Sequence, residues 1–466
     1  MNPLLFDFEQ MQQAFMLEPH PDIETRRSRI KRILSMLNEN EENLCKVIDA
    51  DFGYRQPVET QLAEIIGIRQ AATFALRQLN QWMKPVKVKT PIHLRPSRSF
   101  LLPQPKGVIG IMSPWNYPLC LALIPAISAL AAGNRVILKP SERSPRTSGY
   151  LATLVAQYFH PTEMIVINGG PQTAEHFSGL PFNHLLFTGS TSVGQSVAKA
   201  AAENLTPLTL ELGGKSPVII DSSASLKDCV SRILYGKLFN NGQTCIAPDY
   251  ILVPHQMKDE LIEKMKAAFA AMYENNTQRT YAIDDRQAQR WQDLLQDAQN
   301  KGAAIIPLSN EEVTHQLVVP SLVVDAISTT KVMTEEIFGP IMPIIAYSDL
   351  SEAIAFIRSK PNPLAMYWFG SNEERLRNLL EQTQAGGVCI NDTLLHYNNH
   401  FLPFGGIGQS GMGSYHGKHG FDTFTHYKPI FKTKGLLGMM SLAGTKMIHP
   451  PYGKKIAKLM KTLGKV

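Results

Sequence analysis

The chain is organised around a segment that begins Thr206-Pro-Leu-Thr-Leu-Glu-Leu-Gly-Gly-Lys-Ser216 and ends Asn240-Asn-Gly-Gln-Thr-Cys245. The start predicts a short buried strand, Leu208–Leu212, that places the Glu211 carboxylate among apolar neighbours. The Gly-Gly pair that follows lets the backbone turn without a Cβ penalty. The end places Cys245 on a polar loop, after an Asn-Gly turn and a helix-like run over residues 226–239. The segment thus carries one buried carboxylate and one thiol.

These two groups suit acid–base and nucleophilic chemistry. Burial raises the pKa of a carboxylic acid, which makes Glu211 a candidate general base. A thiol such as that of Cys245 becomes a nucleophile once it is deprotonated. The sequence therefore predicts a base and a nucleophile 34 positions apart.

Composition describes an ordinary globular protein. The 466 residues predict two to four domains with ample core, and the net charge of +6 is too mild and too scattered for a nucleic-acid partner. The five cysteines show no C-x-x-C spacing, which argues against disulfides and a zinc site and for a reducing compartment. The N-terminus lacks the apolar region of a signal peptide, and no apolar run is long enough to span a membrane. We expect a cytoplasmic protein.

The first hundred residues predict helices and then an arm. Residues 22–50 and 56–82 carry apolar side chains at helical spacing, which predicts two long amphipathic helices. Residues 84–105 alternate and contain four prolines, which is typical of an exposed hairpin or arm rather than of a domain core.

Strands and helices alternate from residue 106. We expect strands at 107–112, 135–139, 165–167 and 184–187, with helices at 119–132 and 145–159 between them. This order predicts a parallel sheet covered by helices on both faces, with ligands at the carboxyl ends of its strands. Residues 113–116, 139–142 and 188–190 should therefore line a site. A second α/β run extends to Ile390, with strands near Ile251, Ile305 and Leu322 and helices at 256–274 and 286–300.

The sequence contains two glycine-rich motifs of the kind that can bind phosphate groups. Gly189-Ser-Thr-Ser-Val-Gly194 opens a helix directly after a strand, where free N–H groups can receive an anion; alone, it is equally a plain strand–helix turn. Gly406-Ile-Gly-Gln-Ser-Gly411 matches G-x-G-x-x-G but follows no first βαβ strand and precedes no acidic residue at the required distance. We interpret it as a loop near the active site rather than a phosphate site.

Together, Glu-Leu-Gly-Gly-Lys and Gly-Gln-Thr-Cys resemble the signature of the aldehyde dehydrogenase superfamily, including the spacing between them. The resemblance implies that Cys245 is the nucleophile, Glu211 the base, and Asn116 an oxyanion donor together with the backbone N–H of Cys245. It also implies cofactor contacts: Lys139 and Glu142 at the adenosine ribose, Gly189, Ser190 and Gly194 at the dinucleotide, Glu336 at the nicotinamide ribose, and Phe338 near the ring. A carboxylate at 142 should repel a 2′-phosphate, so we expect NAD, with NADP possible.

The resemblance runs from about residue 20 to 430 and narrows to the class 3 branch, most similar to bacterial coniferyl aldehyde dehydrogenases. The motifs Asp51-Phe-Gly-Tyr-Arg55 and Phe404-Gly-Gly-Ile-Gly-Gln-Ser-Gly-Met-Gly413 carry this finer match. It implies a Rossmann-like NAD(P)-binding domain (1–83 and 106–207), an α/β catalytic domain (208–394), a small β oligomerisation arm, and a basic tail (431–466). Residues 84–105 and 395–430 are the expected bridging or oligomerisation segments. Members of this branch are typically homodimers.

The substrate stays open between an aromatic, coniferyl-type aldehyde and a medium- or long-chain aliphatic one. The candidate pocket residues are Tyr117, Thr244, Ile246, His396 and Tyr397. The rivals are a CoA-acylating or phosphorylating relative, against which Glu211 argues, and a non-catalytic structural protein. No metal site is expected, because His396 and His400 have no acidic or thiol partner at a suitable spacing. Residues 453–466 form a basic amphipathic pattern compatible with an anionic membrane surface, although a solvated or partner-packed tail is favoured.

Overall fold

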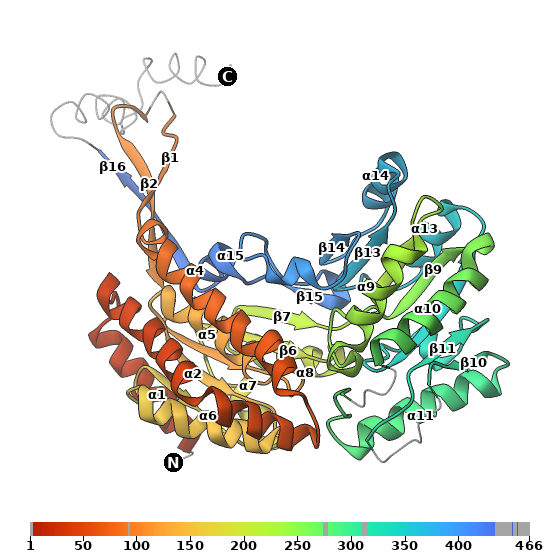
Figure 1. Cartoon of the computed structure of the whole chain (residues 1–466). Helices are drawn as coiled ribbons and strands as arrows, with labels where there is room; N and C mark the ends of the chain where they lie inside the picture. The colour runs from red at the N-terminus through yellow and green to blue at the C-terminus, as the bar shows by residue number, and fades with distance from the viewer. Residues whose placement is uncertain are drawn as a thin grey trace.

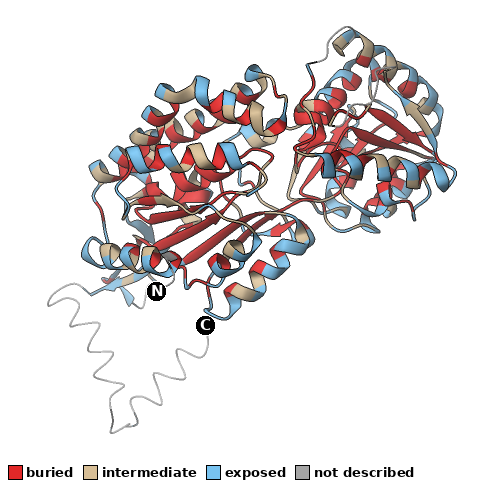
Figure 2. Ribbon diagram, turned by 90° about the horizontal axis from the view of Figure 1, so that it is seen from below, coloured by how far each residue is buried: buried red, intermediate tan, exposed pale blue. Residues whose placement is uncertain are grey.

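The computed structural model describes residues 3–91, 94–273, 278–309 and 316–433, together with Pro450 and Lys454. Within these residues the chain forms two lobes, each built on one mainly parallel sheet, and a small antiparallel sheet that projects from the first lobe (Figure 1). The central strands of both large sheets are buried, and the helices that cover them expose their outer faces (Figure 2). The predicted α/β fold class with a β arm is confirmed. The predicted basic tail, 453–466, lies outside the described residues apart from Lys454.

Helices begin the chain. They are α1 (Pro3–Leu17), α2 (Ile23–Phe52), α3 (Pro57–Thr60), a π-helical turn over Gln61–Ile65, and α4 (Ile66–Trp82). The two predicted amphipathic helices are α2 and the run from α3 to α4. Helix α1 was not predicted, although its buried Leu4, Phe8 and Met11 recur at helical spacing.

The first lobe contains a six-stranded sheet in the order β15-β7-β6-β3-β4-β5. Its parallel strands are β3 (Val108–Met112), β4 (Arg135–Lys139), β5 (Met164–Val166), β6 (His184–Gly189) and β7 (Leu208–Leu212), and β15 (Gly411–Met412) pairs antiparallel with β7. Its crossover helices are α5 (Cys120–Ala131), α6 (Pro145–Tyr158), α7 (Pro171–Ser178) and α8 (Thr191–Ala202).

Strand periodicity distributes the core of this lobe between two faces. In β3, Val108 and Met112 join the apolar cluster under α1, α7 and α8, whereas Ile109 and Ile111 join the cluster under α2, α4, α5 and α6. Alternate side chains of a strand point to opposite faces, so a strand buried on both sides is apolar throughout.

The second lobe contains a seven-stranded sheet in the order β10-β11-β12-β9-β8-β13-β14. The strands are β8 (Pro217–Ile220), β9 (Tyr250–Pro254), β10 (Ala304–Pro307), β11 (Ser321–Val324), β12 (Ile341–Tyr347), β13 (Ala365–Phe369) and β14 (Gly387–Ile390). Only β10 pairs antiparallel within this sheet. The helices are α9 (Leu226–Leu238), α10 (Lys258–Tyr273), α11 (Asp285–Asn300), α12 (Lys331–Thr334), α13 (Leu350–Arg358) and α14 (Glu373–Gln382).

The arm joins two distant parts of the chain. Strand β2 (Arg98–Pro105) pairs on one side with β1 (Val86–Val88) and on the other with β16 (Thr425–Lys432), which follows α15 (Gly417–Thr423). The predicted hairpin at 84–105 is therefore only part of a three-stranded sheet (Figure 1).

The predicted boundary at residue 208 needs a correction. Strand β7 was assigned to the catalytic domain, but it pairs with β6 and belongs to the first lobe. The chain enters the second lobe only at β8, after the turn at Gly213 and Gly214. Glu211 thus lies in the first lobe and Cys245 in the second. The remaining domain boundaries stay predictions.

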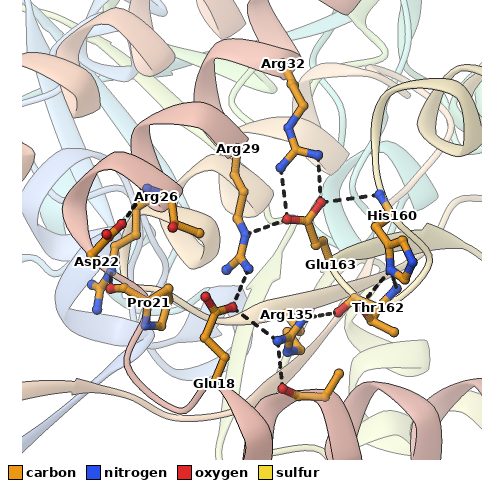
Figure 3. A network of polar contacts seen from close by, with 12 residues as sticks. Glu18, Pro21, Asp22, Arg26, Arg29, Arg32, Arg135, His160, Thr162 and Glu163 are labelled. Carbon is orange, nitrogen blue, oxygen red and sulfur yellow. Dashed lines mark hydrogen bonds and ion pairs between the residues drawn. The ribbon is translucent and has the colours of Figure 1, made fainter.

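A polar network fixes the N-terminal helices to the first sheet (Figure 3). Glu163, just before β5, accepts hydrogen bonds from Arg29 Nε at 3.0 Å and Arg32 Nη1 at 2.6 Å. Glu18 accepts from Arg29 Nη2 at 3.0 Å, and Arg135, at the start of β4, donates to the Ala14 carbonyl at 2.7 Å. The network therefore joins α1, α2 and two strands through charged side chains.

Candidate active site

Cys245 follows a tight turn after α9. Asn240, Asn241 and Gly242 have φ of 52°, 52° and 77°, so three consecutive residues are left-handed. A Cβ on Gly242 would also lie 2.4 Å from the Gly339 carbonyl oxygen, so only glycine fits there. The predicted Asn-Gly turn and polar loop are present, and the loop is buried: residues 240–244 are buried, and Cys245 is half-buried.

Glu211 is buried in β7, with 1% of its surface exposed. Its carboxylate faces the Cys245 thiol and the Thr188 hydroxyl, and among the described residues neither oxygen has a well-formed hydrogen bond. Burial raises the pKa of Glu211 to about 7, with those two neighbours opposing the shift only in part. Near neutral pH this carboxyl group can therefore both release and accept a proton.

Burial also acts on the thiol. It raises the pKa of Cys245 well above its usual value, and the negative charges of Glu211 and Glu336 add to the effect. At neutral pH the free thiol is thus protonated and needs a nearby base. Glu211 is in position to be that base.

Asn116 lies on the loop after β3, at the carboxyl end of the strand. Its Nδ2 donates to the Gln243 carbonyl at 3.0 Å, and its own carbonyl accepts from Asn240 Nδ2 at 3.0 Å. The loop that carries Asn116 and the loop that carries Cys245 are therefore bonded to each other. Both residues line one cavity.

Two cavities meet at Cys245. One has a volume of about 240 Å³ and a mainly apolar lining, and we call it the apolar cavity. The other, of about 550 Å³, lies between the lobes and is lined by Asn116, Glu211, Ser190 and Glu336; we call it the polar cavity. Cys245 and Leu121 line both. A molecule in either cavity would reach the thiol.

Four of the five predicted pocket residues line the apolar cavity: Tyr117, Thr244, Ile246 and Tyr397. The prediction was wrong for His396. Its ring turns away, against Gly387 of β14, and packs on Tyr367 and Phe404 with ring centroids at 6.1 and 6.3 Å. The cause is the 3₁₀ turn over Leu395–Asn398, which sends neighbouring side chains in different directions.

The apolar cavity also has walls that the sequence analysis missed. Leu62 and Ile66 approach from the π-turn and the start of α4, Tyr235 and Phe239 from α9 and its end. Leu62 and Ile66 leave 53% and 38% of their surfaces exposed. Exposed large apolar side chains on an amphipathic helix indicate a binding surface, and this pattern in the sequence could have identified Leu62 and Ile66.

The polar cavity continues into a third, of about 660 Å³, lined by Lys139, Glu142, Gly189 and Ser190. Lys139 Nζ donates to the Pro140 carbonyl at 3.1 Å and lies 3.4 Å from a Glu142 oxygen. Ser190 caps α8, whose first turn opens toward the cavity. Trp115, within the predicted 113–116 segment, lines both cavities, and Arg143, which was not predicted, lies over its ring at 4.6 Å.

This surface fits a dinucleotide. The Ser113 hydroxyl on its wall is buried and has no hydrogen-bond partner among the described residues, so it can bond to a ligand. The N-terminus of α8 favours an anion such as a pyrophosphate. The predicted cofactor contact of Gly194 is corrected, because this residue lines neither the polar cavity nor its continuation. A Cβ on Gly194 would lie 2.7 Å from Leu212 Cδ2, so the glycine allows α8 to pack on β7.

Glu336 and Phe338 close the polar cavity from the second lobe. A Cβ on Gly213 would lie 2.0 Å from a Glu336 oxygen, so that glycine leaves the space that the carboxylate occupies. Burial, followed by the charge of Asp249, raises the pKa of Glu336 to about 8. Its neighbour Glu335 is exposed and lies 3.5 Å from Arg290. The Phe338 ring meets Trp115 edge-on at 5.5 Å.

The described residues meet neither the requirements of a metal site of three or more ligands nor those of a membrane-spanning helix. In the part of the chain that the structure describes, no three His, Cys, Asp or Glu side chains converge on a point where a metal could bind. None of the helices in the described ranges combines the length and apolar character that crossing a membrane requires.

Comparisons with known proteins agree with this architecture. A model of the aldehyde dehydrogenase family matches residues 8–430. A probable coniferyl aldehyde dehydrogenase of Pseudomonas aeruginosa is 42% identical over 97% of this chain and 94% of its own. AldH of Staphylococcus aureus, solved in a substrate-bound state, superposes with a TM-score of 0.89 at 37% identity, over 94% of this chain and 95% of that one.

A more distant solved structure, betaine aldehyde dehydrogenase of Staphylococcus aureus in complex with NAD⁺, is 25% identical and has a TM-score of 0.82 over 92% of this chain and 86% of that one. The family match covers most of the chain, and a relative with more than 40% identity spans nearly all of it. The chain therefore belongs to the aldehyde dehydrogenase family.

Proposed function

We propose that this aldehyde dehydrogenase oxidises an aromatic aldehyde of the coniferyl type to its carboxylic acid, through a thioester on Cys245. One observation carries the proposal: the Cys245 thiol lies where the apolar cavity meets the polar cavity between the lobes, with a buried carboxylate facing it. An apolar aldehyde and a nicotinamide cofactor would thus approach the same sulfur from two sides.

Glu211 is the proposed base in both halves of the reaction. With a pKa of about 7, it can accept the proton of the Cys245 thiol, and the thiolate then attacks the aldehyde carbon. The Asn116 amide and the backbone N–H of Cys245 would donate to the oxygen as negative charge develops on it. After the hydride has left and a thioester remains, Glu211, having passed the thiol proton to solvent, would take a proton from water; attack of the resulting hydroxide on the thioester releases the acid and the Cys245 thiolate.

The cofactor side is assigned to the polar cavity and its continuation. Lys139 and Glu142 would hold the adenosine ribose, the start of α8 with Gly189 and Ser190 the pyrophosphate, and Glu336 the nicotinamide ribose beside Phe338. A nicotinamide dinucleotide bound there accepts the hydride. Solved relatives support a nicotinamide cofactor, since one is a complex with NAD⁺ and another carries the description NADP-dependent. Glu142 favours NAD, because its carboxylate repels a 2′-phosphate.

The lining of the apolar cavity supports an aromatic substrate. Tyr117, Tyr235, Phe239 and Tyr397 present rings to it, and the relatives that this chain resembles include a probable coniferyl aldehyde dehydrogenase. A second candidate is an aliphatic aldehyde of medium or long chain. The partly exposed Leu62 and Ile66 at the edge favour it, because they would shield a chain longer than the cavity.

A panel of aldehydes tests the proposal. NADH formation with cinnamyl-type aldehydes should give a kcat/KM at least about tenfold above that with hexanal or dodecanal, equivalent to about 1.4 kcal/mol of transition-state binding. A value that rises steadily with aliphatic chain length would favour the second candidate. No oxidation of any aldehyde by the folded protein would overturn both.

The assembly and the compartment belong to the same proposal. The projecting arm supports a homodimer, because Val86, Val88 and Phe431 leave 44%, 41% and 53% of their surfaces exposed on it. All five cysteines are free, as expected in the reducing cytoplasm.

A further inference from the structure

A fully buried ion pair lies behind the candidate active site. Arg55 Nη1 donates to Glu64 Oε1 at 3.0 Å, and neither side chain has any exposed surface. Arg55 Nε and Nη2 have no hydrogen-bond partner among the described residues, so the pair does not recover the full desolvation cost of its charges. Stability alone is thus a poor explanation for two charges at this position.

The pair holds the loop that carries Asn116 on both sides. Arg55 Nη1 also donates to the Asn116 carbonyl at 3.3 Å, and the guanidinium lies 5.2 Å from the centre of the Tyr117 ring. Glu64 Oε2 accepts from the backbone N–H groups of Leu119 at 2.7 Å and Cys120 at 3.1 Å. The loop between β3 and α5 is therefore fixed by Arg55 and Glu64, both from the segment that connects α2 to α4.

The same segment reaches the nucleophile loop. Glu59, in α3, accepts from the backbone N–H of Asn240 and from Thr280 Oγ1 at 2.7 Å. Asn240 Nδ2 donates to the Asn116 and Gln243 carbonyls at 3.0 and 3.1 Å. The Tyr117 hydroxyl pairs with Thr244 Oγ1 at 2.6 Å, one residue before Cys245. The strained turn of left-handed residues is thus bonded to the Asn116 loop at several points.

We propose that Arg55 and Glu64 are positioning residues for aldehyde oxidation, whose buried ion pair holds the Asn116 amide in register with the Cys245 sulfur. This inference rests on the proposed roles of Asn116 and Cys245. Neither Arg55 nor Glu64 lines the apolar or the polar cavity, so each acts through the two loops and not on the substrate. Displacement of a donor or nucleophile by about 1 Å can reduce the rate about 10²-fold.

The double variant Arg55→Met/Glu64→Gln tests the proposal, because it removes both charges together. A single variant would leave one unpaired charge in the core and could fail to fold. The amide oxygen of the introduced glutamine can still accept from Leu119 and Cys120, so the start of α5 keeps its bonds while the contacts of Arg55 are lost. Glu163→Gln is the matched control, since it breaks a partly buried arginine pair that lies outside both cavities.

The expected result is a kcat lowered about 10- to 100-fold with aldehyde KM changed less than about threefold, as displacement at the reaction centre predicts. Hydrogen exchange of the 240–247 backbone should accelerate, while that of the second-lobe strands stays constant. Arg55→Lys should retain more activity than the double variant, because it keeps the charge but not the fork of donors. The control should lose stability and keep its kcat.

A folded double variant with unchanged kcat and unchanged exchange would overturn the inference. So would a kcat that falls only in proportion to the folded fraction. Failure of the proposed function is a separate result, in which the wild-type protein oxidises no aldehyde. The exchange measurement then decides alone, because unchanged exchange at 240–247 overturns the anchoring without any enzymatic assay.

Discussion

Cys245 and Glu211 share one buried environment, and the burial shifts the pKa of both groups upward. The raised pKa of Cys245 leaves its thiol protonated at neutral pH. The pKa of Glu211 is about 7, so its carboxylate can take up the thiol proton. Two residues from different lobes thus complement each other chemically. Either one alone in this environment would be a poor catalyst.

Replacement of Cys245 by Ala should reduce aldehyde oxidation by a factor on the order of 10⁴ or more, because it removes the thiol that lines both the apolar and the polar cavity. Cofactor binding, measured by fluorescence titration, should stay nearly unchanged. Cys389→Ala is the control, since that thiol lines neither the apolar nor the polar cavity. Iodoacetamide labelling gives a second check: inactivation that follows modification of a different cysteine would contradict the assignment.

Glu211→Gln should slow release of the acid more than formation of the thioester. We expect a burst of NADH near one per active site, an acyl adduct on Cys245 by intact-mass spectrometry, and a steady rate lower by about 10²–10⁴-fold. In the wild type, the steady rate should rise with pH through about 7, since the base acts only when ionised. Normal turnover of the folded variant, at any pH, would exclude the base role.

Glu142→Gln should weaken the discrimination against NADP. The amide no longer repels a 2′-phosphate, so the NAD/NADP ratio of kcat/KM should fall about tenfold, or about 1.4 kcal/mol. Ser141→Ala, next in sequence, controls for local disturbance. A ratio that does not move would show that residue 142 lies away from the ribose.

Individual side chains were the least predictable part of the site. Glu211, Cys245 and Asn116 were expected together because their motifs are short and contiguous, and the structure brings them to one cavity. His396 could not be oriented, because a single 3₁₀ turn decides which way each side chain points. Arg55 was quoted only as the end of a motif and Glu64 was not singled out; neither was given a role, since their contacts lie 55–61 positions away along the chain.

At the scale of elements, strands and helices followed from periodicity. The strands β3 to β7 and β9 to β11 lie where short apolar runs predicted them, whereas β8 and β12 to β14 fall in an α/β run for which no bounds were predicted. The pairing of β2 with β16 was not expected, because the register of two strands more than 300 positions apart is set by the finished fold and leaves no local signal. Helix α1 was not predicted, although the helical spacing of its apolar residues Leu4, Phe8 and Met11 is present in the sequence.

Glu163→Gln should loosen the contact of α2 with the first sheet. Burial alone would raise the pKa of Glu163, but hydrogen bonds from Arg32 and Arg29 outweigh it and hold the pKa at about 2. Because the folded pKa is depressed, the stabilisation is complete above the ordinary value of 4.5 and is lost as the pH falls toward 2. At pH 7 the variant should lose about 1–3 kcal/mol, a buried pair's value discounted for partial exposure.

Urea unfolding at pH 7, 4 and 3 measures this difference, which should shrink at each lower pH. Glu24→Gln is the matched control, because it breaks a more exposed pair with Arg27 and should cost less than about 0.5 kcal/mol. An effect of Glu163→Gln that is equal at pH 7 and pH 3 would contradict the ionic origin of the stabilisation.

At the scale of the whole molecule, one chain supplies all the residues of the candidate active site, whereas the same chain leaves apolar side chains of the arm exposed. All proposed catalytic and cofactor residues come from the two lobes and line the polar cavity or its continuation. The arm projects from the first lobe, on the side away from the second lobe (Figure 1), and has β1 and β16 as its two edges. Edge strands with exposed apolar side chains are surfaces that pair with another chain. Assembly and chemistry should therefore be separable by mutation.

The variant Val86→Lys/Val88→Lys should convert a dimer into a monomer. Light scattering after gel filtration should give twice the 51.8 kDa chain mass for the wild type and a value near 51.8 kDa for the variant. Charges on an edge strand oppose pairing, while the site is distant from the arm, so kcat per chain should change less than about threefold. Ile327→Lys, an equally exposed apolar position in the second lobe, is the control and should stay dimeric. A wild-type protein that already elutes as a monomer would refute the arm as an assembly surface, and a dimeric double-lysine variant would place the interface elsewhere.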